Sequence, residues 1–129
     1  MNPDAVGTTY PDVPFVVDPA RVAAFREVFG QIEGVPPTFV TAAEFTVFPQ
    51  VIGDPNLGLD FTRVVHGSQD YTYARPLREG ETLTVRARID SIRAKGDTGF
   101  LTVVMELLDA DGGLVCTARA QMVERGGDA

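Results

Sequence analysis

Cysteine, histidine, long apolar runs and positive charge are all scarce in this chain of 129 residues, and each shortage excludes a class of protein. A lone cysteine, Cys116, rules out an intrachain disulfide, and its place in an alternating strand pattern suits a small buried side chain. One histidine and one distant cysteine give no zinc-ligand spacing, so no metal is expected. The glycines are scattered among turns rather than gathered in a nucleotide-binding loop, and no cofactor is expected.

Positive charge is outweighed, since 11 Lys and Arg residues against 18 Asp and Glu residues give a formal net charge of -7. Without a basic cluster, the chain is not expected to bind nucleic acid or an anionic membrane. No stretch approaches the roughly 20 apolar residues that span a bilayer, and residues 1–4 lack the basic and apolar parts of a signal peptide. We therefore expect a cytoplasmic protein with a single domain over residues 1–129.

An amphipathic surface helix is predicted in the first quarter of the chain. Asp18 is suited to cap it and Pro19 to occupy its first position, and Gly30 ends the pattern. Between them, apolar residues recur with the helical period at Val22, Phe25 and Phe29.

A second helix is predicted over residues 38–48, between Pro36-Pro37 and Pro49. The segment is apolar on almost every side, so this helix should be buried, with Pro49 closing it. Glu44 is its one charged residue. Burial would raise the pKa of the carboxyl, as is often seen for general bases, but the favoured interpretation is structural, with Glu44 reaching the rim of the helix or a dimer interface.

From residue 62 onward the apolar period changes to two, which predicts four strands over residues 62–76, 82–93, 100–108 and 114–123. The 82–93 segment is the clearest, with one dry face made by Leu83, Val85, Ala87 and Ile89. Turn residues separate the last three strands, which therefore form an antiparallel meander. A dry sheet face needs cover and an apolar helix needs a concave surface, so we expect an α+β fold with an antiparallel sheet wrapped around the buried central helix.

His66 is the most informative polar residue, because it is the only imidazole that could act as an acid or base at neutral pH. Strand alternation puts it on one face with Ser68 and Asp70, and puts Tyr71 and Tyr73 on the other. A hydrogen-bonded histidine at a sheet end or interface is the favoured interpretation. A Ser68-His66 dyad is geometrically conceivable, but no G-x-S-x-G elbow surrounds the serine.

Several other polar residues carry weaker signals. Tyr71, Tyr73 and Arg75 are more typical of a sheet edge or subunit interface than of a ligand site. Arginine forks are suited to the phosphates of a coenzyme A or phosphopantetheine carrier, although a solvated sheet face explains two of the candidates equally well. The candidates are Arg86, Arg88 and Arg93.

Three segments of the chain resemble the N-terminal hot-dog domain of the MaoC-like (R)-specific enoyl hydratases and 3-hydroxyacyl dehydratases. They read PPTFVT at 36–41, LDFTRVVHGSQ at 59–69 and YARPLREGE at 73–81, and the order of elements matches over about residues 10–124. The resemblance is to the branch found in actinobacterial fatty-acid and mycolic-acid synthesis. It implies a hot-dog fold and an acyl-ACP or acyl-CoA substrate.

The chain departs from that family at its catalytic motif. Active members carry an Asp and a His about five residues apart just before the central helix, whereas residues 29–37 here read FGQIEGVPP. The resemblance therefore implies a non-catalytic, acyl-chain-binding subunit whose MaoC-like partner supplies the pair in a heterodimer. No catalytic residue is assigned with confidence, and His66 and Glu44 are the fallback. The predicted substrate-binding residues are Phe39, Phe45, Phe48, His66 and Gly67.

Two alternatives remain open at this stage. One is a self-sufficient hot-dog thioesterase in which Glu44 activates water. The other is a non-enzymatic homodimer that binds an acyl intermediate, since a fold alone does not fix a function.

Overall fold

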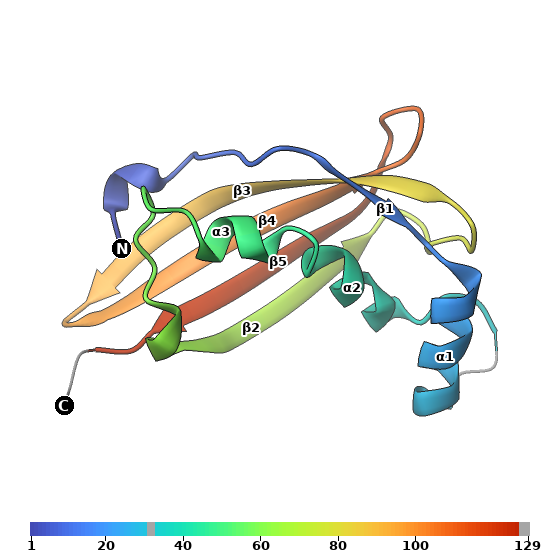
Figure 1. Cartoon of the computed structure of the whole chain (residues 1–129), viewed down its shortest axis with the longest axis horizontal. Helices are drawn as coiled ribbons and strands as arrows, with labels where there is room; N and C mark the ends of the chain where they lie inside the picture. The colour runs from blue at the N-terminus through green and yellow to red at the C-terminus, as the bar shows by residue number, and fades with distance from the viewer. Residues whose placement is uncertain (31–32, 127–129) are drawn as a thin grey trace.

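The computed structural model describes residues 1–30 and 33–126 and contains a five-stranded antiparallel sheet against which short helical segments pack (Figure 1). The strand order is β1-β3-β4-β5-β2, so β1 and β2 are the two edges. The strands are β1 Val13–Val16, β2 Val64–Tyr73, β3 Thr82–Lys95, β4 Thr98–Leu108 and β5 Leu114–Glu124. The helical segments are η1 Pro3–Ala5, α1 Pro19–Phe29, η2 Pro37–Val40, α2 Thr41–Glu44, α3 Phe48–Ile52 and η3 Phe61–Arg63.

The meander predicted for the last three strands is confirmed. β3 pairs with β4 and β4 with β5, both antiparallel, and one glycine in each connecting turn, Gly96 and Gly112, takes the left-handed conformation that the turn requires. The predicted dry face is also present, because Leu83, Val85, Ala87 and Ile89 are all buried. These central strands therefore form most of the sheet, although each ladder has one register shift, between Ile89 and Ser91 in β3 and between Leu107 and Leu108 in β4.

Strand β1 is an element that the sequence analysis missed. Its four residues include Pro14, which cannot donate to a strand ladder and argues against a strand unless the strand lies at an edge. β1 does lie at the edge of the sheet, paired with β3 from Val13 opposite Val85 to Val16 opposite Thr82. The sheet therefore has five strands rather than the predicted four, and the additional strand is this short edge strand.

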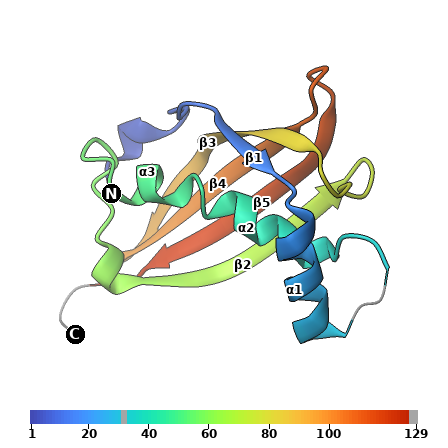
Figure 2. The ribbon, with the colours of Figure 1, turned by 45° about the vertical axis from the view of Figure 1, so that its right-hand side comes forward.

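The helix α1 begins and ends where the sequence predicts. The Asp18 carboxylate accepts a hydrogen bond from the backbone N–H of Ala20 at 3.1 Å, and Gly30 ends the helix with φ 74°. The apolar stripe, however, is only partly used, since Val22 is fully buried whereas Phe29 is 65% exposed. Figure 2 shows why, as α1 extends beyond the end of the sheet.

The central helix is not one helix closed by Pro49, as predicted, but three short segments, η2, α2 and α3. A turn over residues 45–47 separates α2 from α3, and Pro49 lies in the first turn of α3. Proline lacks the N–H that a continuous helix needs at this point, but it is well tolerated in a first turn. The break also corrects the expectation of burial on all sides, because Phe45 in the turn is 64% exposed.

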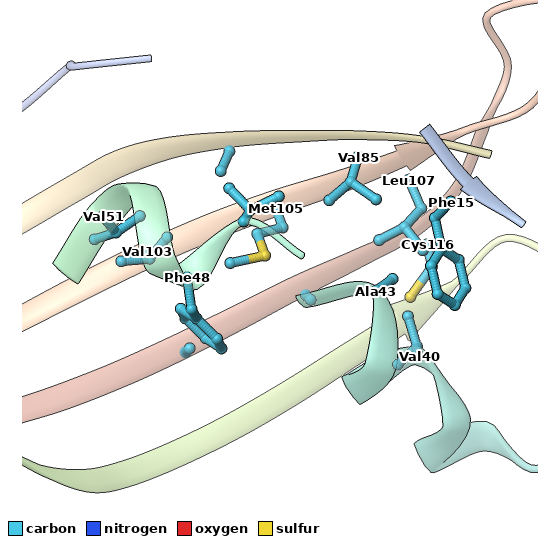
Figure 3. Close-up of a cluster of buried hydrophobic side chains, with 14 of the residues drawn as sticks. Phe15, Val40, Ala43, Phe48, Val51, Val85, Val103, Met105, Leu107 and Cys116 are labelled. Carbon is cyan, nitrogen blue, oxygen red and sulfur yellow. The ribbon is translucent and has the colours of Figure 1, made fainter. Parts of the chain in front are cut away.

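The hydrophobic core lies between this broken helix and the inner face of the sheet, here defined as the face toward α2 and α3 (Figure 3). Ala43 and Val51 of the helical segments belong to one buried cluster with Leu107 of β4 and Cys116 of β5. Cys116 is fully buried, as predicted. Each large side chain that is fully buried in such a core contributes about 1.5–3 kcal/mol of transfer free energy.

Candidate functional site

A β-bulge at Gly67 sets the geometry of the site on the edge strand β2. His66 lies opposite Met122 and Ser68 lies opposite Gln121, so Gly67 is an extra residue in β2. A Cβ atom at this position would lie 3.1 Å from Val123 Cγ2 and 3.3 Å from the Gln121 carbonyl oxygen. Glycine is therefore favoured here by the close approach of β5.

The bulge reverses the predicted alternation of side chains along β2. Neighbouring residues of β5 point to opposite faces, so His66, opposite the buried Met122, faces inward, and Ser68 faces outward. Beyond the bulge, Tyr71 and Tyr73 lie opposite buried residues of β5 and also face inward. The predicted grouping of His66 with Ser68 and Asp70 was wrong, because one extra residue changes the phase.

The first residues of β2, including Val64 and His66, and the helical segment α3 enclose a groove of about 420 Å³. Aromatic and aliphatic side chains make up its wall, and the exposed rings of Phe45 and Phe61 lie at the surface. His66 is the one ionisable side chain among the lining residues. The groove is lined by Phe45, Phe48, Pro49, Ile52, Phe61, Val64, His66 and Met122. Its volume and composition are typical of a site for a small apolar ligand.

His66 is exposed to solvent from the groove side and is held by its own strand. Its Nε2 atom donates a hydrogen bond to the Ser68 carbonyl oxygen at 3.0 Å. The Ser68 side chain lies on the other face of the sheet, so the two residues do not form a nucleophilic dyad.

Glu44 lies between α2 and β2 and is 1% exposed, so the expectation that it reaches the rim of the helix was wrong. The other placement expected for it, at a dimer interface, stays a prediction. Its Oε1 atom accepts a hydrogen bond from the Tyr71 hydroxyl at 2.5 Å, and the Thr41 hydroxyl lies 2.7 Å from the same Tyr71 oxygen. The Oε2 atom is buried without a hydrogen-bond partner among the described residues. The amide of the nearby Gln69 donates instead to the Arg119 carbonyl oxygen at 3.3 Å.

Burial raises the pKa of the Glu44 carboxyl above its usual value, as the sequence analysis anticipated. The hydrogen bond from Tyr71, the nearby Gln69 and the charge of His66 oppose the shift without cancelling it. Burial and the Glu44 hydrogen bond likewise raise the pKa of the Tyr71 hydroxyl. In this buried cluster of Thr41, Glu44 and Tyr71, burial therefore works against ionisation of the carboxyl, whereas the hydrogen bond from Tyr71 works in favour of it.

The other predicted residues divide between the core and the surface. Phe39 does not reach the groove but packs against Phe15 and Phe25, with ring centroids 6.1 and 5.5 Å away. Tyr73 donates a hydrogen bond to the Pro37 carbonyl oxygen and thereby joins β2 to η2. Arg75 forms two hydrogen bonds with the Glu81 carboxylate, at 2.7 and 3.0 Å, beside the turn that leads into β3.

The three candidate phosphate-binding arginines are not equivalent in the structure. Arg86 forms an ion pair with Asp12 at 2.9 Å, and Arg88 lies 3.6 Å from the Asp90 carboxylate. Arg93 has no ion pair with a described residue. Only Arg93 therefore remains open to an external anion.

Several groove residues were not predicted from the sequence. Ile52 was missed because the helical pattern was ended at Pro49, and Met122 because its strand was not matched to β2. Phe61 belongs to a segment that the resemblance already included, and its position next to a strand start was the available signal.

The segment that holds the catalytic pair in the resembling family carries no such pair here. Residues 29–37 contain neither Asp nor His, although Gln31 and Ile32 lie outside the described residues. Within residues 1–30 and 33–126, no group of three His, Cys, Asp or Glu side chains is arranged to hold a metal ion. Over the same ranges, every helix is too short or too polar to cross a bilayer.

Comparison with known proteins identifies the family. Residues 4–118 match the model of the FAS1-like dehydratase domain region. A UPF0336 protein of Streptomyces coelicolor is 35% identical over 97% of this chain and 95% of its own length. A UPF0336 protein of Streptomyces avermitilis is 36% identical over the same shares.

Two solved structures share the fold at low sequence identity. A C-terminally truncated HadBC (3R-hydroxyacyl-ACP dehydratase) complex from Mycobacterium tuberculosis superposes with a TM-score of 0.78 at 19% identity, covering 95% of this chain and 99% of that one. A MaoC-like dehydratase superposes with a TM-score of 0.82 at 20% identity, covering 96% of this chain and 43% of that one. The predicted α+β hot-dog fold is therefore confirmed, and the chain belongs to the FAS1-like dehydratase domain region family.

Proposed function

We propose that this protein is the acyl-chain-binding, non-catalytic subunit of a (3R)-hydroxyacyl-thioester dehydratase or enoyl hydratase. The observation that carries the proposal is the groove itself, which has an apolar wall and a single ionisable side chain, His66. Such a site can hold an aliphatic chain, and each methylene group that it buries contributes about 0.8 kcal/mol to binding.

The groove lacks the groups that the elimination of water requires. Removing water from a 3-hydroxyacyl thioester takes a base for the C2 proton and an acid for the departing C3 hydroxyl. His66 can serve one of these roles, but no carboxyl group lies among the lining residues. Glu44 is buried and is not among the groove residues, and its Oε1 atom accepts a hydrogen bond from the Tyr71 hydroxyl. A partner subunit that carries the Asp and His pair would supply both roles.

The edge strand β2 is suited to receive that partner. It is ten residues long, and β5 pairs with only one of its two sides. Long unpaired edges are the usual place where a second chain docks. Val65 of this strand and the groove residues Phe45 and Phe61 are exposed apolar side chains that a partner would cover. The HadBC structure, a complex in the same fold, gives a precedent.

The experiment compares the chain alone with the chain copurified with a MaoC-like subunit that contains the Asp and His pair. We expect no hydration of crotonyl thioesters by the chain alone and turnover by the pair. In that pair, Phe45→Ala should raise KM for long-chain substrates more than for crotonyl thioesters, because only a long chain reaches the groove. Robust turnover by the chain alone would contradict the proposal, as would tight acyl-thioester binding that no partner converts into turnover, which instead favours the homodimeric binding protein.

A second candidate function is favoured by one observation, the buried Glu44 carboxyl with its raised pKa and unpartnered Oε2 atom. In a hydrolytic reaction, Glu44 would take a proton from water as the water oxygen attacks the thioester carbonyl. The C–S bond would then break, and Glu44 would return the proton to the departing sulfur, which releases a free acid and a thiol. Thiol release from acyl-CoA that disappears in Glu44→Gln would establish this thioesterase activity. Its absence in the wild-type chain would exclude it.

A further inference from the structure

Six of the 11 Lys and Arg side chains form ion pairs with carboxylates of described residues. Ion pairs within 4.0 Å engage Arg26, Arg63, Arg75, Arg86, Arg88 and Arg119. Arg93 and Lys95, by contrast, have no ion pair with any residue in the described ranges. Both lie near the end of β3, two residues apart on the same strand. Two unneutralised cations thus come together in a chain with a net charge of -7.

These two side chains lie on the outer face of the sheet, opposite to the core. Ile92 is paired with the fully buried Leu101, so Arg93, the next residue, points outward. Arg93 is paired with Phe100 of β4, which therefore shares the outer face. The hairpin turn between Lys95 and Thr98 closes directly beside them, and this pair ends the ladder. The cations are thus anchored on paired backbone rather than on a loop.

A hollow of about 470 Å³ lies at this place, lined by Arg93, Ala94, Lys95, Phe100 and Gln121. Phe100 is half-buried and offers a ring as part of the lining. Gln121 comes from β5, where its neighbours Ala120 and Met122 are buried on the inner face, and its amide offers both a donor and an acceptor. The hollow therefore combines two cations, an aromatic ring and an amide from three adjacent strands.

Each of these groups matches one part of a phosphorylated nucleotide. Guanidinium and ammonium groups bind phosphate oxygens through charge-assisted hydrogen bonds. A flat base stacks favourably on an aromatic side chain, and an amide can form hydrogen bonds with the edge of the base. We propose that the hollow lined by Arg93, Lys95, Phe100 and Gln121 is a binding site for a phosphorylated adenine nucleotide. The site goes beyond the acyl groove, because it lies on the other face of the sheet and needs no acyl chain.

Two sources would present this chemistry, the nucleotide end of coenzyme A or a separate free nucleotide. The first test therefore uses adenosine 3′,5′-bisphosphate, which has the phosphates and base without pantetheine or acyl chain, in calorimetric titrations of the full chain. We expect saturable binding that weakens as the salt concentration rises. Arg93→Gln together with Lys95→Gln should weaken it by about tenfold or more, since both charge-assisted hydrogen bonds to phosphate are lost.

A matched control removes the same amount of charge elsewhere. Arg21 and Arg78 are exposed, and neither forms an ion pair with a described residue, so Arg21→Gln with Arg78→Gln should leave nucleotide binding unchanged. Phe100→Leu keeps an apolar side chain without the ring and should weaken nucleotide binding while leaving the binding of inorganic phosphate unaffected. No saturable binding of the bisphosphate, or equal losses in the two double variants, would overturn the proposal.

A comparison of ligands then separates the two sources. If the site takes the end of coenzyme A, coenzyme A should bind more tightly than the bisphosphate and lose affinity in the Arg93/Lys95 variant. If it takes a free nucleotide, the bisphosphate or ADP should bind at least as tightly as coenzyme A. In both cases, the Arg93/Lys95 variant paired with its catalytic partner should turn over a pantetheine thioester normally, because this substrate has no nucleotide. Loss of the nucleotide site is therefore distinguishable from failure of the proposed dehydratase function.

Discussion

The central strands β3 and β4 and the edge strand β2 contribute very different inner faces to the same interior. β3 and β4 present aliphatic side chains to it, among them Leu83, Val85, Val103 and Leu107. β2 presents the inward-facing polar side chains His66, Tyr71 and Tyr73, and its ladder is interrupted by the bulge at Gly67. The difference teaches that the dry centre supplies stability, whereas the edge strand positions the groove and the polar network. The predictions below test this division.

The largest loss of stability is expected from a substitution in the buried aliphatic core on β3 and β4. Leu107 is fully buried in β4, and Leu107→Ala removes packed methyl groups and leaves a cavity. The free energy of unfolding should fall by about 2–5 kcal/mol, as measured by urea denaturation. A loss below about 1 kcal/mol would show that the centre repacks easily and does not dominate stability.

A smaller loss is expected from the polar network at the edge. Tyr71→Phe removes the hydroxyl that donates to Glu44 Oε1, which leaves the buried carboxyl without a hydrogen-bond donor among the described residues. Leaving a buried polar group unpaired costs about 1–3 kcal/mol. The same denaturation measurement on Tyr73→Phe, which leaves Glu44 and its Tyr71 hydrogen bond in place, is the matched control. Equal stability of Tyr71→Phe and the wild type would mean that the network contributes nothing.

The pH dependence of stability reports the state of Glu44. Because burial raises its pKa in the folded state, the folded protein holds the proton more tightly than the unfolded chain. This contribution is fully present below the ordinary Glu pKa of 4.5 and is lost as the pH rises through the raised value. Glu44→Gln should remove this decline, so wild type and variant diverge with rising pH in urea denaturation. Parallel pH profiles would indicate an ordinary pKa for Glu44.

The smallest effect on stability is expected at the mouth of the groove. Phe45 is 64% exposed, so Phe45→Ala should change the free energy of unfolding by at most about 0.5 kcal/mol. The same change should weaken the binding of a fluorescent long-chain fatty acyl probe severalfold, because the ring lines the groove. Val28→Ala, at an exposed apolar residue of α1 outside the groove, is the control for both measurements.

The sequence predicted the regular elements well because their signals are local. The Asp18 cap, the Gly30 end of α1, the alternation of β3 and the glycine turns each depend on a few neighbouring residues, and the structure contains them all. The candidate site was predicted only in part. Phe45, Phe48 and His66 do line the groove, whereas Phe39 packs in the core and Gly67 forms the bulge.

What the sequence determined by itself was the α+β composition, the meander and the missing Asp and His before the central helix. What only the tertiary structure decided was the face of each β2 side chain, the break before Pro49 and the one candidate arginine left without a carboxylate. Those features depend on partners far away in the sequence. A single extra residue, accommodated against the closely approaching β5 because glycine has no Cβ atom, exchanges the faces of the β2 side chains that follow it. Local periodicity carries no information about such a contact.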